Sequence, residues 1–189
     1  MIKQLLLLSL LTLSACSLHA QPSVTNWPAF NCNSGDVTIT FVDLHICTNT
    51  TTNSKVAVLA GVIPTMVFEQ GDNRFDALSY ESADKALSGL PAHLDAANAS
   101  QALDTLFSWP DSSNLTAKQQ VLLQVFGIEA NTKLMQFNKH NIVAYIRLNE
   151  GAADNTVFII VGDSNNLYRL IGNFDEVGVQ QWLRSISIE

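Results

Sequence analysis

The chain has little charge, and little positive charge in particular. Lys and Arg number ten against seventeen Asp and Glu, and charged residues make up 14% of the 189 residues, where an ordinary soluble domain has about 25%. Nucleic-acid binding needs clustered cations to neutralise phosphates, so with a net charge of −7 we expect no nucleic-acid partner. The hydrophobic content of 47% is enough to bury a core, which excludes a disordered chain.

Long hydrophobic runs are also scarce, and the longest lies near the N-terminus. Residues 5–13 (LLLLSLLTL) are apolar apart from Ser9 and Thr12. As a helix these nine residues span about 14 Å, half of the roughly 30 Å that a bilayer core requires. Behind the positive charge of Lys3, the run predicts a signal peptide over residues 1–15. A buried N-terminal helix is the alternative.

The end of this segment carries the most specific motif of the chain. Leu13-Ser14-Ala15-Cys16 resembles the lipobox of bacterial lipoproteins. The resemblance implies cleavage before Cys16, diacylation of its thiol and acylation of its new amino group, so the first partner would be the membrane, reached through a lipid anchor. Several acyl chains give a lasting attachment that one chain does not.

The residue that follows the cysteine bears on the expected location. It is Ser17, not the Asp associated with inner-membrane retention, so the resemblance implies the outer membrane of a Gram-negative cell with the domain in the periplasm. An alternative cleavage after Leu18-His19-Ala20 would release a soluble periplasmic or secreted protein.

Cysteine is rare as well. Of the three, lipidation or cleavage removes Cys16 and leaves Cys32 and Cys47. In an oxidising compartment such a pair is a disulfide candidate, and closing a loop of this size is worth roughly 3 kcal/mol in the chain-entropy model. Two free buried thiols are the alternative. A zinc site has little support, because neither cysteine has a second one two to four residues away.

The remaining chain divides into a tether and one domain. Residues 16–35 contain prolines and little periodicity, which indicates a lipidated cysteine and a tether, with Trp27 and Phe30 as anchors on the domain. Residues 36–189 form the predicted globular domain. Within it, residues 36–47 alternate as one long strand with a change of phase at Phe41-Val42, and residues 55–68 as a second β segment that Pro64 bends.

The middle of the domain is helical in pattern. Ser82 is positioned to cap a short helix that stops at Gly89, and residues 100–108 carry apolar side chains at helical spacing. Thr116 and Gln119 have the spacing of a capping box before a further helix. We interpret these as packing helices.

The last third predicts four strands and a helix. The strands cover residues 133–137, 142–148, 156–161 and 167–174, and Asp175 opens a helix with one apolar face. Residues 157–186 are similar in element order to the end of PsbP-like domains, through the Leu-Ile-Gly-Asn-Phe turn into a helix. The predicted fold class is α+β, an antiparallel sheet of five to six strands with a helical middle segment and a C-terminal helix packed on the sheet.

The residues that could carry chemistry do not assemble into a set. Gly162-Asp163-Ser164 resembles the nucleophile block of GDSL hydrolases, but no histidine follows it to serve as base, so we interpret it as a hairpin turn. Asp43 and His45 share a face of the first predicted strand, where a carboxylate could orient an imidazole. Side chains two residues apart on a strand, however, seldom form a hydrogen bond with each other.

Metal and cofactor signals are equally weak. The histidines at 45, 93 and 140 lack metal-ligand spacing, and Asp72, Asn73 and Asp76 miss the calcium-loop pattern. No glycine-rich phosphate loop or dinucleotide motif occurs. We therefore predict no cofactor, no metal site and no catalytic residues.

The sequence therefore predicts a non-enzymatic cell-envelope lipoprotein that binds a protein partner as an accessory, inhibitor or immunity-type factor. A periplasmic hydrolase whose site assembles only in the fold, and a carrier of a small apolar or lipid ligand beneath the sheet, are the alternatives. A hydrolase needs a cleft that joins a histidine to a carboxylate or serine, a carrier needs an apolar cavity, and a partner-binding protein needs an exposed apolar patch.

Overall fold

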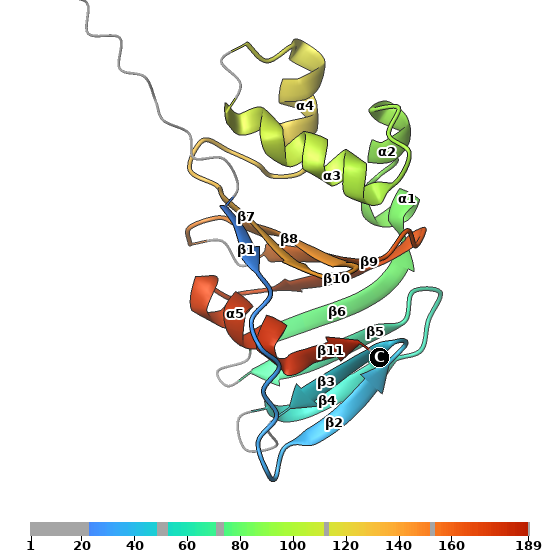
Figure 1. The fold of residues 1–189 in the computed structure, drawn as a ribbon, viewed down its shortest axis with the longest axis vertical. Coiled ribbons are helices and arrows are strands. Elements are labelled where there is room, and N and C mark those ends of the chain that lie inside the picture. Colours follow the sequence, from blue (N-terminus) through green and yellow to red (C-terminus); the bar gives the residue numbers. More distant parts are fainter. Residues whose placement is uncertain (1–22, 49–52, 71–73, 112–113, 152–153, 189) are drawn as a thin grey trace, which may run out of the picture.

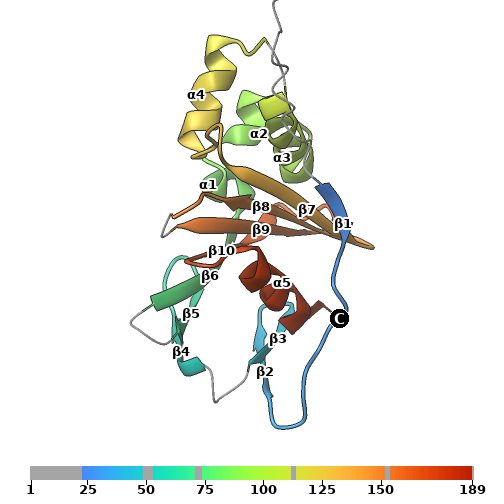
Figure 2. The same ribbon diagram turned by 90° about the vertical axis from the view of Figure 1, so that its left-hand side faces the viewer.

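The computed structural model describes residues 23–48, 53–70, 74–111, 114–151 and 154–188. They form an α+β fold of three layers, with helices on one face of a large sheet and a helix with a small sheet on the other (Figures 1 and 2). The signal-peptide segment and the motif that ends at Cys16 lie outside the described residues.

The middle layer is an eight-stranded sheet in the order β1-β7-β8-β9-β10-β6-β5-β4. Neighbouring strands are antiparallel, except that β1 runs parallel to β7. The bounds are β1 Ser23–Asn26, β4 Asn53–Leu59, β5 Thr65–Gln70, β6 Arg74–Ser82, β7 Lys133–Lys139, β8 Ile142–Leu148, β9 Asn155–Val161 and β10 Asn166–Gly172.

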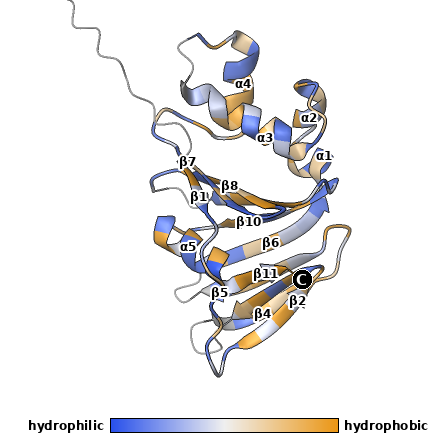
Figure 3. Ribbon diagram, in the orientation of Figure 1, coloured by the Kyte–Doolittle hydropathy of each residue, from blue (hydrophilic) through white to orange (hydrophobic). Residues whose placement is uncertain are grey.

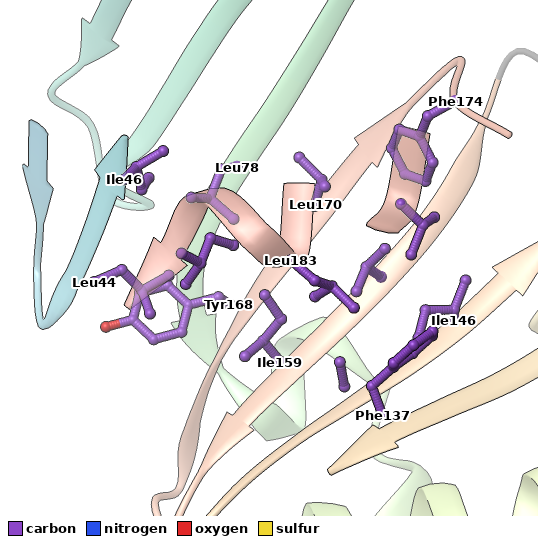
Figure 4. Packing of buried hydrophobic residues seen from close by; sticks show 14 of the residues in the cluster. Leu44, Ile46, Leu78, Phe137, Ile146, Ile159, Tyr168, Leu170, Phe174 and Leu183 are labelled. Carbon is purple, nitrogen blue, oxygen red and sulfur yellow. The ribbon is translucent and has the colours of Figure 1, made fainter. Parts of the chain in front are cut away.

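One face of this sheet is covered by α5 and the small sheet, which has the order β11-β3-β2. Their bounds are α5 Glu176–Ser185, β2 Val37–Phe41, β3 Leu44–Thr48 and β11 Ile186–Ile188. Asp175 caps α5 by accepting a hydrogen bond from Gly178 N at 2.8 Å, as its position predicts. Val179 and Leu183, four residues apart on one side of α5, are buried against the sheet, and Figure 4 shows Leu183 among its side chains.

The other face is covered by the helical middle segment. Its elements are α1 Ala83–Ala86, α2 Leu90–His93, α3 Ala99–Ser108, the 3-10 turn Trp109–Asp111 and α4 Ala117–Val125. The two layers explain why β9 is apolar from Val157 onward: Val157 and Ile159 belong to the core under α5, while Phe158 and Ile160 belong to the core under the helices. The capping box of Thr116 and Gln119 at the start of α4 is confirmed.

The segment expected to be a tether enters the fold. Residues of β1 pair with β7, and the Trp27 indole is buried and donates to Leu183 O at 2.9 Å. Asn31 N donates to Arg184 O at 2.9 Å, so this segment also satisfies carbonyls at the end of α5. Trp27 is an anchor as predicted, but Phe30 is exposed.

The region expected to be one long strand is a hairpin. The chain reverses at Val42-Asp43 between β2 and β3, at the point where the sequence shows its change of phase. Val42 has φ of 58°, a left-handed conformation that is strained for a β-branched residue. The backbone N–H of Asp43 donates to Tyr168 Oη at 3.1 Å, which fixes the turn to the large sheet.

The size of the predicted sheet is also corrected. The α+β class, the helical middle segment and the packed C-terminal helix are confirmed, but the large sheet has eight strands and is mixed. Residues 55–68 divide into β4 and β5, and β6 was missed because its first part looks like a polar loop. In β6 the polar Asp76 is buried and accepts a hydrogen bond from Trp182 Nε1 at 3.0 Å, which compensates for its burial.

Cys32 and Cys47 are joined by a disulfide, which confirms the predicted pairing. Their Cα atoms lie 5.6 Å apart, and the bond ties the segment after β1 to strand β3. In the chain-entropy model a loop of this length contributes about 3 kcal/mol of stability.

Candidate functional site

The candidate nucleophile block is a turn. Gly162, Asp163 and Ser164 connect β9 to β10, and Gly162 has φ of 58°, which glycine adopts without strain. Ser164 Oγ accepts a hydrogen bond from Asn166 N at 3.0 Å, so its hydroxyl stabilises the turn. The interpretation of this motif as a hairpin turn is confirmed.

Asp43 and His45 do not share a strand face, because Asp43 lies in the β2–β3 turn and His45 lies on β3. The imidazole Nδ1 of His45 lies 3.2 Å from Thr40 Oγ1 on the neighbouring strand. His140 sits in the exposed turn between β7 and β8, and His93 at the end of α2. The three histidines therefore come from separate parts of the fold.

The cluster with metal-ligand types found among the described residues consists of Cys32, Cys47 and Asp36. Both sulfur atoms belong to the disulfide, so neither is available as a thiolate ligand. Of the three residues that miss the calcium-loop pattern, Asp72 and Asn73 lie outside the described residues, and Asp76 accepts a hydrogen bond from Trp182.

Two polar groups on the sheet hold the helical layer in place. The Tyr145 hydroxyl lies 2.8 Å from both Ser100 Oγ and Asp104 Oδ1 of α3. The pKa of Tyr145 is raised, mainly by burial and also by the Asp104 carboxylate. Arg147 donates to the carbonyl of Phe126, the residue that caps the end of α4, at 2.6 Å.

The charge of Arg147 is itself perturbed. Burial and then the nearby Arg169 charge lower the pKa of Arg147. Its other nitrogen donates to Asp154 O and Thr156 Oγ1 at 2.6 and 3.0 Å. These two bonds stay within the sheet, between β8 and the start of β9, and the bond to Phe126 joins the sheet to α4, so the role of Arg147 is structural.

The helices cover only part of their face of the large sheet. The side chains that pack under them come from β7, β8, β9 and β10, whereas β4, β5 and β6 extend away from the helices (Figures 1 and 2). The pairing register places a row of apolar side chains on the uncovered part, from Ala57 through Val67 to Ala77. Leu59 and Phe75 share this face and are 55% and 54% exposed. We call Ala57, Leu59, Val67, Phe75 and Ala77 the open face.

The turn between β4 and β5 extends the open face. Residues 57–64 (AVLAGVIP) are all exposed, and Val62 reaches 91%. Figure 3 shows the hydrophobic colour of this turn at the margin of the molecule. Strand β4 is the last strand of the sheet on this side. An exposed apolar edge strand is a typical site of pairing with another chain.

A second apolar surface lies at the opposite end of the fold, along α4. A groove of about 580 Å³ runs between this helix and the corner that joins α1 to α2. Its apolar lining consists of Ala117, Val121, Leu122, Val125 and Phe126, all from α4 or its end, and its polar lining of Ser88, His93 and Lys118. We call this surface the helical groove.

The helical groove also contains two residue types that a hydrolase could use. It brings Ser88 and His93 into one concavity, but no hydrogen bond joins the two, and no carboxylate is in its lining. Lys118 Nζ donates to the backbone carbonyl of His93 at 2.7 Å. A serine without a bonded base is not activated as a nucleophile.

Sequence reasoning missed both surfaces. Residues 57–64 were expected only to be part of a β segment that Pro64 bends, with no assignment of which side chains are exposed, and α4 was interpreted as a packing helix. Val121 and Val125 are in fact more than half exposed, while Leu123 on the opposite side of α4 is buried. One feature of the sequence could have indicated the exposed side of α4. Four valine and leucine residues follow Gln120 within five positions, which is more than one face of a helix can bury.

None of the described helices combines the length and apolar character that crossing a membrane requires. No protein-family model, no curated protein and no solved structure matches the chain. Its function is therefore argued from these two surfaces.

Proposed function

We propose that this chain is a non-enzymatic envelope lipoprotein whose domain binds a protein partner through the open face. The observation that carries the proposal is the contiguous apolar surface on β4, β5 and β6, which the helical layer leaves uncovered. Solvated faces of antiparallel sheets normally carry polar side chains, whereas the row of Ala57, Val67 and Ala77 is apolar.

The geometry of the open face supports a protein as its partner. The apolar row crosses three strands, and β4 adds a free edge where a partner strand can pair. Polar groups frame the apolar centre: Lys55 and Glu69 form an ion pair at 3.4 Å on the same face. An apolar centre with a polar rim is the usual anatomy of a protein interface. The net charge of −7 favours a basic partner, through steering of the encounter.

The hydrolase alternative has less support, because the helical groove, which brings a histidine and a serine together, leaves them without a mutual hydrogen bond.

The lipid anchor at Cys16 has the lipobox resemblance as its support. Intact-mass measurement of the membrane fraction tests it: the expected chain begins at Cys16 and carries lipid mass, and a chain that begins at Gln21 without lipid contradicts it.

The open face is tested with a paired charge substitution. The variant Leu59→Asp with Phe75→Asp places two carboxylates on the apolar surface, and both side chains are exposed enough that stability should change by less than about 0.5 kcal/mol each. Val177→Asp is the matched control, because Val177 is 62% exposed on α5.

The measurement is quantitative mass spectrometry of proteins that co-purify with the tethered chain after crosslinking in the native envelope. We expect a partner that is enriched with the wild type and with Val177→Asp and is reduced at least tenfold with the double variant. Thermal melts of all three proteins establish that they are folded. A partner that the double variant retains in full shows that binding occurs elsewhere, and the absence of any enriched protein contradicts the proposed function.

A further inference from the structure

The helical groove is separate from the open face, so a partner that binds the open face would leave it free. It lies along α4 at the other end of the fold from β4 and β5 (Figure 1). We propose that it binds a long-chain anionic amphiphile, a fatty acid whose carboxylate lies at Lys118 and whose chain lies along α4. This inference is independent of the proposed function.

The lining of the groove is suited to an alkyl chain. Five of the eight lining residues are apolar, and they follow α4 from its first turn to the residue after its last. At 1.5 Å per residue the nine residues of α4 make a track of about 13 Å. The volume of about 580 Å³ is within the range of small-molecule sites.

The charge of the groove selects the head group. In a chain of net charge −7, the one charged side chain in this lining is the cation Lys118. His93 also lines the groove, and a Cβ built on Gly89 would lie 3.9 Å from His93 Nε2 and 3.8 Å from Asp84 Oδ1, so His93 faces a region that an acid also approaches, whereas no acid is in the lining beside Lys118. The carboxylate site is therefore assigned to Lys118.

Lys118 is held where a head group would lie. Its Nζ donates one hydrogen bond to His93 O at 2.7 Å, which leaves two of the three ammonium donors for a ligand. Ala117 and Lys118 are in the first turn of α4, where backbone N–H groups lack intrahelical acceptors and the helix dipole favours an anion. The cation and the helix start thus act on the same end of the apolar track.

The groove is also preformed. The capping box fixes the start of α4, and Arg147 and Asn149 of the sheet side bind the carbonyls of Phe126 and Gly127 at its end. A site whose walls are fixed before binding loses less entropy when the ligand enters.

The test uses the purified full chain. A fatty acid with a photoactivatable diazirine is crosslinked to the protein in solution, and the adducts are mapped by mass spectrometry. Laurate, dodecyl phosphate and dodecanol are the competitors. We expect saturable adducts on residues 115–126, displaced by laurate at lower concentration than by dodecanol.

Variants separate the charge from the apolar track. Lys118→Glu should raise the laurate concentration needed for displacement roughly 5- to 10-fold, since a partly exposed ion pair accounts for about fivefold and reversal adds repulsion. The same variant should leave displacement by dodecanol unchanged. Lys118→Arg should retain wild-type behaviour, and Val125→Asp should remove the adducts. Lys85→Glu is the control for net charge, because Lys85 is exposed on α1 and is not in the lining.

Each outcome decides the proposal. The pattern above, with thermal melts that show folded variants, supports it. The absence of saturable adducts on α4 overturns it, as does labelling that Lys118→Glu and Val125→Asp leave unchanged. Displacement by dodecyl phosphate with none by laurate overturns the assignment of a carboxylate head group, and adducts on β4 or β5 with none on α4 place the ligand on the open face and overturn the groove.

Discussion

Replacing Gly172 by alanine tests how the buried carboxylate of Asp76 is held. Gly172 ends β10 next to β6, and a Cβ at this position would meet Asp76 Oδ1 and lie 2.7 Å from Asp76 Cγ and 3.0 Å from Phe174 Cδ1. Asp76 is 4% exposed and accepts a hydrogen bond from Trp182 Nε1 of α5 at 3.0 Å. The added methyl group must therefore displace a group that the surrounding core holds.

The size of the effect follows from these distances. To restore an ordinary contact of about 3.4 Å, Asp76 Cγ must move by more than half an ångström, which disturbs the 3.0 Å hydrogen bond that Trp182 Nε1 donates to this carboxylate. A lost bond to a charged group costs about 1.5–3 kcal/mol, and overpacking of a core adds about 1–3 kcal/mol. We expect Gly172→Ala to lower the free energy of unfolding by about 3–5 kcal/mol, or Tm by roughly 10 °C.

The assay is urea unfolding followed by tryptophan fluorescence, with Gly61→Ala as the control. The nearest heavy atom to a Cβ on Gly61 is Ile63 O at 3.9 Å, so this change should stay within about 0.5 kcal/mol. In an Asp76→Ala background the methyl group has room, and Gly172→Ala should cost at least 2 kcal/mol less than in the wild type, by about the amount of the relieved clash. A cost below about 1 kcal/mol in the wild type, or additivity of the two changes, would refute the reasoning.

Three further changes probe other parts of the fold. Val42→Gly should stabilise the protein by about 0.5–1 kcal/mol, because glycine adopts the left-handed φ of 58° in the β2–β3 turn without strain. Urea unfolding measures this change. A loss of stability would mean that the packing of the valine side chain contributes more than its backbone strain costs. Replacing Cys32 and Cys47 by alanine should cost about 3 kcal/mol, and reductant should then have no effect on the melt; a reductant-sensitive melt of the double variant would contradict this. Burial foremost raises the pKa of Tyr168 to about 12, so its contribution is complete below pH 10 and is lost as pH rises from 10 to 12. Tyr168→Phe should lose about 1 kcal/mol at pH 7 with the bond from Asp43 N, and its stability should fall less steeply over that alkaline window; equal slopes would place the titration elsewhere.

The sequence and the structure agree most closely where local signals act alone. The caps at Thr116 and Asp175, and the strands of the last third, were predictable because a capping side chain and an alternating strand need only their neighbours along the chain. The disulfide was predictable because the chain has three cysteines, and the assignment of Cys16 to the lipobox motif leaves a single pair.

The elements that were missed depend on partners distant in sequence. Strand β6 carries Asp76 in its middle, and a buried carboxylate is tolerated there only because Trp182, more than a hundred residues later, donates to it. Strand β1 pairs in parallel with β7, which no local pattern announces. The hairpin turn places Val42 in a left-handed backbone conformation that valine disfavours. The hydrogen bond from Asp43 N to the Tyr168 hydroxyl of the large sheet stabilises this turn.

The sequence by itself determined the α+β class, most helix and strand positions in the second half, and the cysteine pair. Its composition also argued against a nucleic-acid partner and a disordered chain. Each of these inferences rests on residues that are near in sequence or few in number. Tertiary structure alone decided which apolar residues are exposed. Hydrophobicity predicts burial only when another layer is present, and the helices stop short of β4–β6 while α4 leaves Val121 and Val125 without cover. Both proposed binding surfaces follow from that uneven covering of the sheet and of α4.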